Sequence, residues 1–233
     1  MLAVYQSWAH SLCAPVFWRD KDARSHNGTV TFLRTGKEVL GITNRHVADG
    51  LIDCTYEVGR RCQVGNAYLD PGRLIARHSD MDLATFQLSD VFLCQAGDRF
   101  RPATVTAWPP IPPSEGEAAM FGGFPGIYRN QKDDGSVDFS FAWFAGKVQS
   151  SSRNNIGIVL DIARSIATSP LPRIPPNADL GGWSGGPVFR VIEEGSIERL
   201  ELAAIIYEYS PVNEITLAHP LSDLAEDGTF NCQ

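Results

Sequence analysis

The fold of this 233-residue chain is indicated most directly by one short stretch, Gly181-Gly182-Trp183-Ser184-Gly185-Gly186-Pro187-Val188. It places a serine inside a glycine-dense turn, which a proline and an apolar, strand-like run then close. Glycine pairs around a serine are also common in flexible linkers, so the stretch alone has an ordinary explanation. Glycine, however, tolerates the unusual backbone angles that let an N–H group point at a ligand oxygen. The interpretation therefore depends on which other residues could act with Ser184.

Two further stretches carry a histidine and an acid at the ends of predicted strands. They read Gly41-Ile42-Thr43-Asn44-Arg45-His46-Val47 and Asp80-Met81-Asp82-Leu83-Ala84-Thr85. Taken singly, a histidine at a strand end is usually a surface residue, and an aspartate before a strand usually forms a turn. A serine hydroxyl, however, is a weak nucleophile that needs a nearby base, and this base needs an acid to orient it. The joint appearance of the three stretches therefore indicates nucleophilic catalysis.

Composition and charge exclude other classes of protein. Apolar residues make up 43% of the chain and charged residues 20%, and 27 acidic against 20 basic residues give a net charge of −7. A nucleic-acid-binding protein normally carries a basic surface, so we expect no nucleic-acid partner. No run approaches the ~18 apolar residues of a membrane helix, and the first residues do not read as a signal peptide. We therefore expect no membrane partner and a cytoplasmic location.

The five cysteines are Cys13, Cys54, Cys62, Cys94 and Cys232. Their odd number and wide spacing argue against a disulfide framework and for a reducing compartment, although Cys54 and Cys62 could pair across a hairpin. None has the close Cys and His spacing of a zinc site. We therefore expect neither a metal nor a cofactor.

The remaining sequence favours an all-β fold. Short apolar or alternating runs, separated by turn residues, predict strands over residues 29–33, 39–43, 83–88, 104–107, 118–121, 139–144, 156–160, 188–192, 200–207 and 215–218. Helix is predicted only as a turn at 47–50 and a short segment at 223–225 that Ser222 would cap. The prolines of 108–113 exclude a central strand there, and the prolines of 169–176 predict a long loop.

These motifs resemble those of the chymotrypsin-fold, trypsin-like serine peptidases, in particular a bacterial branch without signal peptide or disulfides. The stretch Thr43-Asn44-Arg45-His46-Val47 resembles the sequence around that branch's general base, and Asp82-Leu83-Ala84 resembles the sequence around its acid. The stretch Gly182-Trp183-Ser184-Gly185-Gly186-Pro187 resembles its nucleophile motif, and Gly122-Gly123-Phe124-Pro125-Gly126 resembles a turn early in the family's second barrel. The resemblance spans about residues 29–221.

The resemblance implies two six-stranded antiparallel β-barrels with the active site in the cleft between them. It implies an N-terminal barrel over residues 1–107 that carries His46 and Asp82, and a Pro-rich linker over 108–113. A C-terminal barrel over 114–233 would then carry Ser184. The expected protein is a bacterial, cytoplasmic enzyme.

The resemblance also implies a role for each residue in cutting a polypeptide substrate. Ser184 attacks the scissile carbonyl, His46 takes its proton and returns it to the leaving amine, and Asp82 orients His46. The backbone N–H groups of Gly182 and Ser184 form the oxyanion hole. Asp80 is a rival for the role of the acid, but Asp82 directly precedes the Leu-Ala pair that the motif requires.

By the same resemblance, Ala178, Tyr207, Tyr209 and His219 wall the pocket for the residue before the scissile bond. Ala178 stands where trypsin-type relatives place an acid, which removes the usual anchor for Arg or Lys, and Tyr209 narrows the entrance. We therefore expect a small or medium apolar side chain in this pocket. Two alternatives remain for His219: it selects Glu or Asp when protonated, or it only packs at the strand end.

One position departs from the secreted relatives. Where they place an aspartate that pairs with a freshly cut N-terminus, this chain has Trp183, so activation through that ion pair is excluded. The oxyanion turn must then stand formed by itself or be set by something else. Because the segment 163–181 is long, we expect a weakly active or gated resting enzyme, whose loop a regulatory protein partner could shift.

Two other functions compete with that of a serine endopeptidase. A catalytically silent binding or scaffold module would usually have lost the serine or the histidine, and neither is lost. An esterase of the α/β-hydrolase type needs Gly-x-Ser-x-Gly between a strand and a helix, with its histidine last in the chain. Here His46 comes first and a strand is predicted after Ser184, so the esterase class is excluded.

Overall fold

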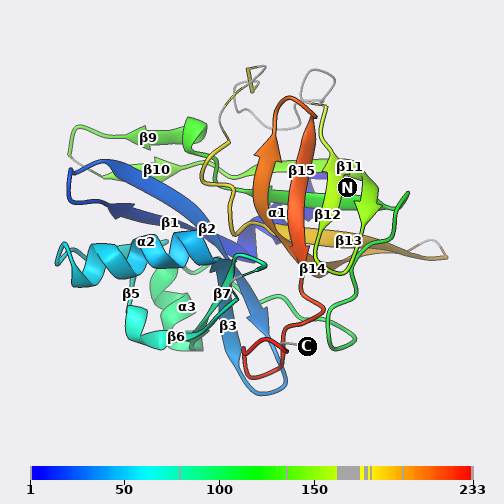
Figure 1. Ribbon diagram of the computed structural model, residues 1–233, viewed down its shortest axis with the longest axis horizontal. Helices are drawn as coiled ribbons and strands as arrows, with labels where there is room; N and C mark the ends of the chain where they lie inside the picture. Colours follow the sequence, from blue (N-terminus) through cyan, green and yellow to red (C-terminus); the bar gives the residue numbers. More distant parts are fainter. Residues whose placement is uncertain are drawn as a thin grey trace.

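The first half of the chain forms one open sheet of seven antiparallel strands (Figure 1). In the computed structural model, which describes residues 2–78, 80–134, 136–161, 174–175, 178, 180–195 and 197–231, the strand order across this sheet is β5-β4-β1-β2-β3-β7-β6. The strands are β1 (Cys13–Arg19), β2 (Ser25–Arg34), β3 (Val39–Asn44), β4 (Cys62–Val64), β5 (Ala67–Leu69), β6 (Leu74–His78) and β7 (Leu83–Leu88).

The second half forms a closed barrel of six strands in the order β11-β12-β15-β14-β13-β8. The barrel strands are β8 (Ala118–Gly123), β11 (Ala142–Ser151), β12 (Ile156–Val159), β13 (Pro187–Glu194), β14 (Ile197–Ser210) and β15 (Ile215–Pro220). A separate hairpin of β9 (Arg129–Gln131) and β10 (Val137–Phe139) reaches over β1 and β2 (Figure 1). The strand predicted over 139–144 is thus two strands, with a break after Phe139.

Three α-helices occur in the described part of the chain, namely α1 (Leu2–Ser11), α2 (Arg45–Tyr56) and α3 (Asp90–Ala96). Helix α2 is longer than the turn predicted at 47–50, because its buried residues Val47, Leu51 and Cys54 follow the spacing of one helix face. The segment predicted at 223–225 forms a turn rather than a helix. Among the described helices, none is long and apolar enough to cross a membrane.

The expectation of two six-stranded antiparallel β-barrels is confirmed for the second half, whereas the first half is a half-barrel sheet of seven strands. The edges of this sheet, β5 and β6, do not meet. The strand predicted at 104–107 is not formed, and Ala103 directly before it makes only an isolated bridge to Leu33. A hydrogen bond of 2.8 Å from the Asn66 N–H to the Ala96 carbonyl ties the end of α3 beside β5. The Pro-rich segment 108–113 lies between the sheet and the barrel and has neither helix nor strand.

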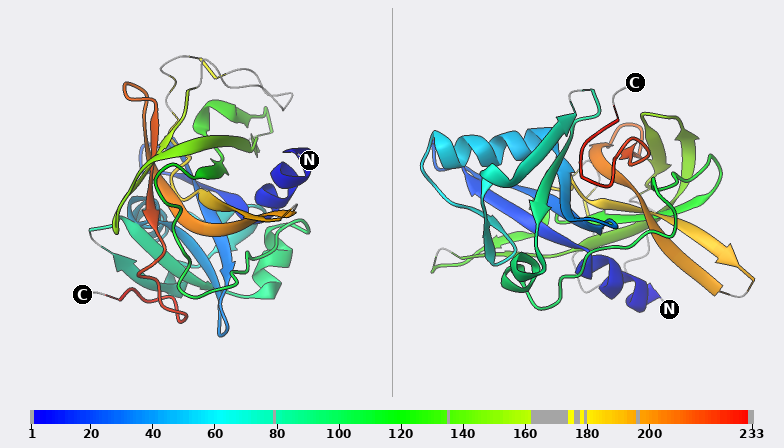
Figure 2. Two further views of the ribbon diagram at one scale, coloured as in Figure 1. Left: turned by 90° about the vertical axis from the view of Figure 1, so that its right-hand side faces the viewer. Right: turned by 90° about the horizontal axis from the view of Figure 1, so that it is seen from below.

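The sheet and the barrel share a hydrophobic core. One cluster of buried side chains joins Leu40 and Ile42 of β3 to Phe189 of β13. Helix α1 packs on the same cluster, with the Trp8 and Phe189 rings 5.0 Å apart, and it lies against the β13–β14 ribbon (Figure 2). Residues at the junction of sheet and barrel therefore pack against side chains of both.

Four cysteines are free thiols in the structure, and Cys232 lies outside the described residues. Cys54 and Cys62, which were open candidates for a pair, are both buried and unlinked. Burial raises the pKa of Cys62 to about 12, and the neighbouring Cys54 adds to the rise. The thiolate that disulfide chemistry needs is therefore disfavoured at this position.

Candidate active site

His46 and Asp82 meet at one end of two paired strands. Strands β3 and β7 are antiparallel neighbours with Asn44 opposite Leu83, so the residues that follow β3 come next to the residue that precedes β7. The His46 Nδ1 atom lies 2.6 Å from Asp82 Oδ2. Because a carboxylate can only accept, Nδ1 carries the proton, and Nε2 keeps the lone pair that a general base needs.

Asp82 also caps helix α2. Its Oδ1 atom accepts from the His46 N–H at 3.0 Å, and its carbonyl accepts from the Arg45 N–H at 2.8 Å. The first N–H groups of a helix have no partner within the helix and carry partial positive charge, which favours a carboxylate there. The Asn44 side chain donates to the same Asp82 carbonyl at 3.0 Å. In the sequence, the place of Asn44 in the histidine motif is the one signal for this role.

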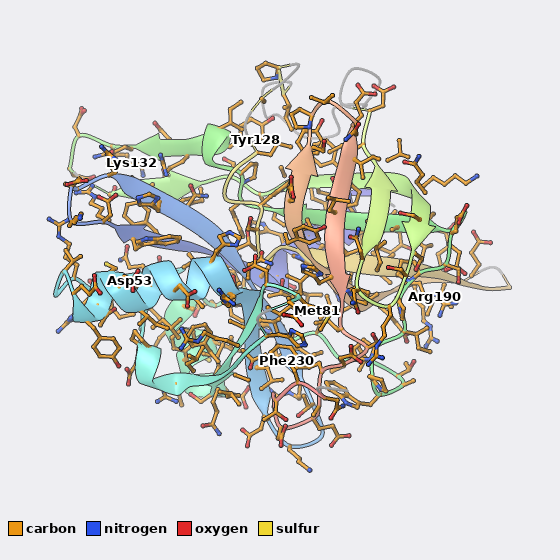
Figure 3. All side chains as sticks on the ribbon, in the orientation of Figure 1. Asp53, Met81, Tyr128, Lys132, Arg190 and Phe230 are labelled. Carbon is orange, nitrogen blue, oxygen red and sulfur yellow. The ribbon has the colours of Figure 1, made fainter. Side chains whose placement is uncertain are left out.

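The pKa of Asp82 is lowered from its ordinary value. Burial by itself raises the pKa of this carboxyl, but the hydrogen bonds and the charge of His46 outweigh burial. Asp82 is therefore ionised at neutral pH and can stabilise a positively charged imidazole ring. Met81, which precedes Asp82, is labelled near the middle of the molecule in Figure 3.

Ser184 lies close to the His46 end of α2. A Cβ atom placed on Gly28 of β2 would lie 2.8 Å from Val47 Cγ1 and 3.5 Å from the Ser184 carbonyl oxygen. The Ser184 hydroxyl donates to the Tyr207 carbonyl at 3.2 Å, and it makes no hydrogen bond to His46 among the described residues. Hydrogen bonds between catalytic groups are often unmade until substrate binds. In this structure the serine hydroxyl and the histidine are therefore not paired.

The turn around Ser184 requires glycine. Gly182 and Gly185 have φ angles of +97° and +91°, which side-chain-bearing residues rarely adopt. A Cβ atom on Gly185 would lie 1.8 Å from the Thr29 carbonyl oxygen, so no larger residue fits. Within the described part of the chain, the N–H groups of Gly182 and Ser184 donate to no protein acceptor. Two such unpaired donors are what an oxyanion hole needs.

The residues predicted to wall the substrate pocket fall into two groups. Ala178 belongs to the buried cluster of Trp183, and the Tyr209 ring meets the Trp183 ring edge-on at 6.4 Å. His219 instead stacks on Tyr207, with ring centres 4.1 Å apart. Most of segment 163–181, including Asp179, lies outside the described residues.

His219 has the surroundings of a structural residue. Its side chain is buried and its Nδ1 atom donates to the Asn154 carbonyl at 2.8 Å. Burial lowers the pKa of His219, although the Asn154 carbonyl and the Asp82 charge oppose the change. This environment disfavours the protonated ring that selection of an acidic substrate residue would need, so the packing alternative is favoured.

The structure also distinguishes between the two candidates for the acid. Asp80, the rival acid, lies exposed in the turn before β7, whereas Asp82 contacts His46. In the part of the chain that the structure describes, no three His, Cys, Asp or Glu residues gather so that they could hold a metal ion.

No protein-family model and no curated protein matches the sequence. Solved structures are similar to it in fold. A thermostable serine protease from an extremophilic microorganism shares 14% identity, with 91% of this chain and 93% of that chain covered and a TM-score of 0.52. The active form of a protease from M. tuberculosis shares 13% identity, with 94% of this chain and 81% of that chain covered and a TM-score of 0.55.

A serine endoprotease from Yersinia pestis shares 18% identity over 93% of this chain, with a TM-score of 0.52, and this chain spans 61% of that protein's length. Identities this low show the fold alone. Together with the closed barrel and the half-barrel sheet, the likenesses show the fold of the chymotrypsin-type, trypsin-like serine proteases. What the chain does must be argued from its site.

Proposed function

We propose that this protein is a serine endopeptidase that works through an acyl-enzyme, with His46, Asp82 and Ser184 as its catalytic residues. The observation that carries the proposal is the 2.6 Å contact between His46 Nδ1 and Asp82 Oδ2 beside a glycine turn that presents Ser184. Likeness of fold to serine endopeptidases supports it. The substrate class is a polypeptide.

The proposed reaction has two halves. The Ser184 hydroxyl oxygen attacks the scissile carbonyl while His46 Nε2 takes the hydroxyl proton, and the negative oxygen of the tetrahedral intermediate accepts from the N–H groups of Gly182 and Ser184. The C–N bond then breaks, and His46 gives its proton to the leaving amine. Water attacks the acyl-enzyme in the same way, which releases the acid product and restores Ser184.

A catalytically silent binding module is the second candidate, and one observation favours it. The Ser184 hydroxyl is engaged by the Tyr207 carbonyl rather than by His46. A hydrogen bond of this kind contributes only about 1 kcal/mol, however, so a bound substrate can readily displace it. The two candidates differ in one measurable property, the reactivity of Ser184.

Ser184→Ala tests the proposed function. We expect the purified wild type to be labelled at Ser184 by a fluorophosphonate probe and to hydrolyse unfolded casein, and the variant to do neither, because no neighbouring group replaces the nucleophile. Ser150→Ala, an exposed serine on β11, is the matched control and should react like the wild type. Retention of hydrolysis within tenfold in Ser184→Ala would refute the assignment. An unlabelled but folded wild type would favour the silent module.

Three finer features stay predictions within this proposal. Tyr209 packs against Trp183, and Ala178 offers no charge, which together support a preference for a small or medium apolar residue before the cut. Gating by a regulatory partner depends on segment 163–181, most of which lies outside the described residues. A cytoplasmic location rests on the sequence alone.

A further inference from the structure

Every carbonyl group in the turn from Gly181 to Gly186 accepts a hydrogen bond. The donors come from four places: the turn itself, barrel strand β14, the segment that follows β8, and strand β2 of the sheet. The pairs are Gly126 N–H to Gly181 (2.6 Å), Thr29 Oγ1 to Gly182 (2.9 Å), Gly186 N–H to Trp183 (2.8 Å), Thr29 N–H to Ser184 (2.8 Å), Thr31 Oγ1 to Gly185 (2.8 Å) and Ile206 N–H to Gly186 (2.8 Å). The turn is therefore held along its whole length.

Thr29 contributes more of these contacts than any other described residue. Its side chain is fully buried in β2. The hydroxyl donates to the Gly182 carbonyl at 2.9 Å and accepts from the Phe124 N–H at 3.1 Å, so both its donor and an acceptor site are used. Its backbone N–H holds the Ser184 carbonyl, and its own carbonyl accepts from the Thr43 hydroxyl at 2.7 Å.

These contacts determine where the Gly182 N–H points. A peptide group is planar, with its N–H and C=O on opposite sides, so a bound carbonyl orients the N–H of the following residue. Gly126 holds the peptide group before Gly182, and the Thr29 hydroxyl holds the peptide group after it. Through Phe124, the same hydroxyl also holds the turn that carries Gly126. The Thr29 hydroxyl thus holds the peptide group after Gly182 directly, and the peptide group before it indirectly through Phe124 and Gly126.

Trp183 secures the turn on its other side. Its indole ring is 2% exposed and packs edge-on against Phe121 and Phe144, with ring centres 5.9 Å and 5.2 Å apart. The Trp183 ring thus occupies the position at which secreted relatives have an aspartate, which pairs with a newly cut N-terminus. The turn therefore has anchors on both sides that exist before any cleavage.

We propose that Thr29 is a positioning residue for the oxyanion hole, whose hydroxyl keeps the Gly182 N–H aimed at the developing oxyanion through its contacts with the Gly182 carbonyl and with the turn that carries Gly126. This inference rests on the proposed endopeptidase function and deepens it, because it names the group that orients a donor of the oxyanion hole. Thr29 touches the turn and not the reacting atoms, so it acts through Gly182.

The test compares Thr29→Val with Thr29→Ser. Valine keeps the branched shape and removes the hydroxyl, whereas serine keeps the hydroxyl. Thr85→Val is the matched control, because it also removes a buried hydroxyl that donates to a carbonyl, that of Gly228 at 2.6 Å, in the same sheet. For each protein, kcat and KM are measured with a peptide substrate, and affinity is measured for a peptide aldehyde whose serine adduct carries the oxyanion.

We expect kcat of Thr29→Val to fall about 10- to 100-fold, with KM within threefold of wild type, because an oxyanion donor acts mainly in the transition state. Affinity for the peptide aldehyde should fall in parallel. Thr29→Ser and Thr85→Val should stay within threefold of wild type in kcat. An unchanged kcat in folded Thr29→Val, or an equal fall in Thr85→Val, would overturn the proposal.

A readout that does not depend on catalysis separates this inference from the proposed function. In a ¹⁵N-labelled wild type, the Gly182 and Ser184 amides should each give one sharp signal, and in Thr29→Val these signals should broaden or double. If the wild type does not hydrolyse peptides but the two amide signals broaden or double in Thr29→Val, the proposed function fails and the positioning role of Thr29 stands. If the amide signals do not change, the positioning role fails whatever the activity.

Discussion

Asp82 performs two tasks with one short side chain. One carboxyl oxygen accepts from the backbone N–H at the start of α2, and the other accepts from the His46 ring. The helix and the histidine are therefore aligned by the same group. The lowered pKa of Asp82 follows from this arrangement, since hydrogen bonds and positive charge favour the ionised form over the effect of burial. A change that keeps one carboxyl oxygen for α2 and replaces the other should consequently disturb the histidine more than the fold.

Asp82→Asn tests that role. The amide can present its NH₂ group to His46 Nδ1, which favours the tautomer with the proton on Nε2. Nε2 then has no lone pair with which to accept the Ser184 proton. We expect kcat to fall by about 10⁴-fold at neutral pH, with the thermal midpoint lowered by only a few degrees.

Asp80→Asn provides the control for Asp82→Asn, since Asp80 was the rival acid and lies two residues away in the turn. It should keep kcat within threefold of wild type. Steady-state kinetics on the two purified variants measures both values of kcat. A larger fall in kcat for Asp80→Asn than for Asp82→Asn would make Asp80 the acid that orients His46.

The motif residues of the site could be predicted from sequence, whereas the residues that hold them could not. His46, Asp82 and Ser184 lie in short patterns whose residue types are dictated by chemistry. Thr29 lies 153 residues from Gly182 and looks like any threonine of an alternating strand. Its role comes from the way the sheet packs on the barrel, which no local pattern contains.

At the scale of elements, helix α1 depends on an aromatic contact that pH can disturb. The His10 ring stacks on Phe141 at 4.9 Å and lies 5.6 Å from Phe124. Its Nε2 atom is buried without a hydrogen-bond partner among the described residues. Burial, with a smaller contribution from the Arg99 charge, lowers the pKa of His10 to about 4. Protonation of this ring therefore opposes the docking of α1.

His10→Phe should make the fold more tolerant of acid. The pKa of His10 is about 4 in the folded chain and 6.5 in the unfolded chain, so the unfolded state binds more protons between these values. The free energy of unfolding of the wild type should therefore fall as pH drops from 6.5 to 4, by about 2–3 kcal/mol more than that of His10→Phe. Urea unfolding at several pH values measures the difference, and parallel curves for the two proteins would contradict it.

Strands could be predicted from the sequence where the alternation of apolar and polar residues is long. The alternating run 83–88 matches β7 at both ends, and 39–43 matches β3 to within one residue. Strands β4, β5 and β9 have three residues each and are too short to show alternation. Helix α2 contains Gly50, which weakens a helix signal but is needed because a Cβ atom there would lie 2.6 Å from the Trp18 ring.

At the scale of the whole molecule, the sheet and the barrel depend on each other. They share the buried cluster around Phe189, and hydrogen bonds from Thr29 and Thr31 of β2 enter the turn at Ser184. The sequence predicts two bodies of β-structure but not how they are joined, because the joining contacts link residues more than 150 positions apart. We expect sheet and barrel to unfold together.

Thr31→Val tests this coupling. The Thr31 hydroxyl is buried and donates to the Gly185 carbonyl at 2.8 Å, so its loss should cost about 1–3 kcal/mol and lower the thermal midpoint by about 3–8 °C. Scanning calorimetry should show one transition in both proteins, with a calorimetric enthalpy equal to the van't Hoff enthalpy. Two separate transitions, of which only one moves in Thr31→Val, would show that the halves unfold independently.

The hydrogen bond from the Gly185 N–H to the Ile206 carbonyl, 2.9 Å long, has a consequence for biosynthesis. A ribosome delivers the chain from its N-terminus at about 5–20 residues per second, so Thr29 and His46 emerge long before Ile206. Until the last barrel strands follow, the turn at Ser184 lacks a partner that it needs for its shape. Under the proposed function, a nascent chain therefore carries a base and an acid but no working nucleophile. The order of synthesis therefore delays the final shape of the turn at Ser184 until the last barrel strands have been made.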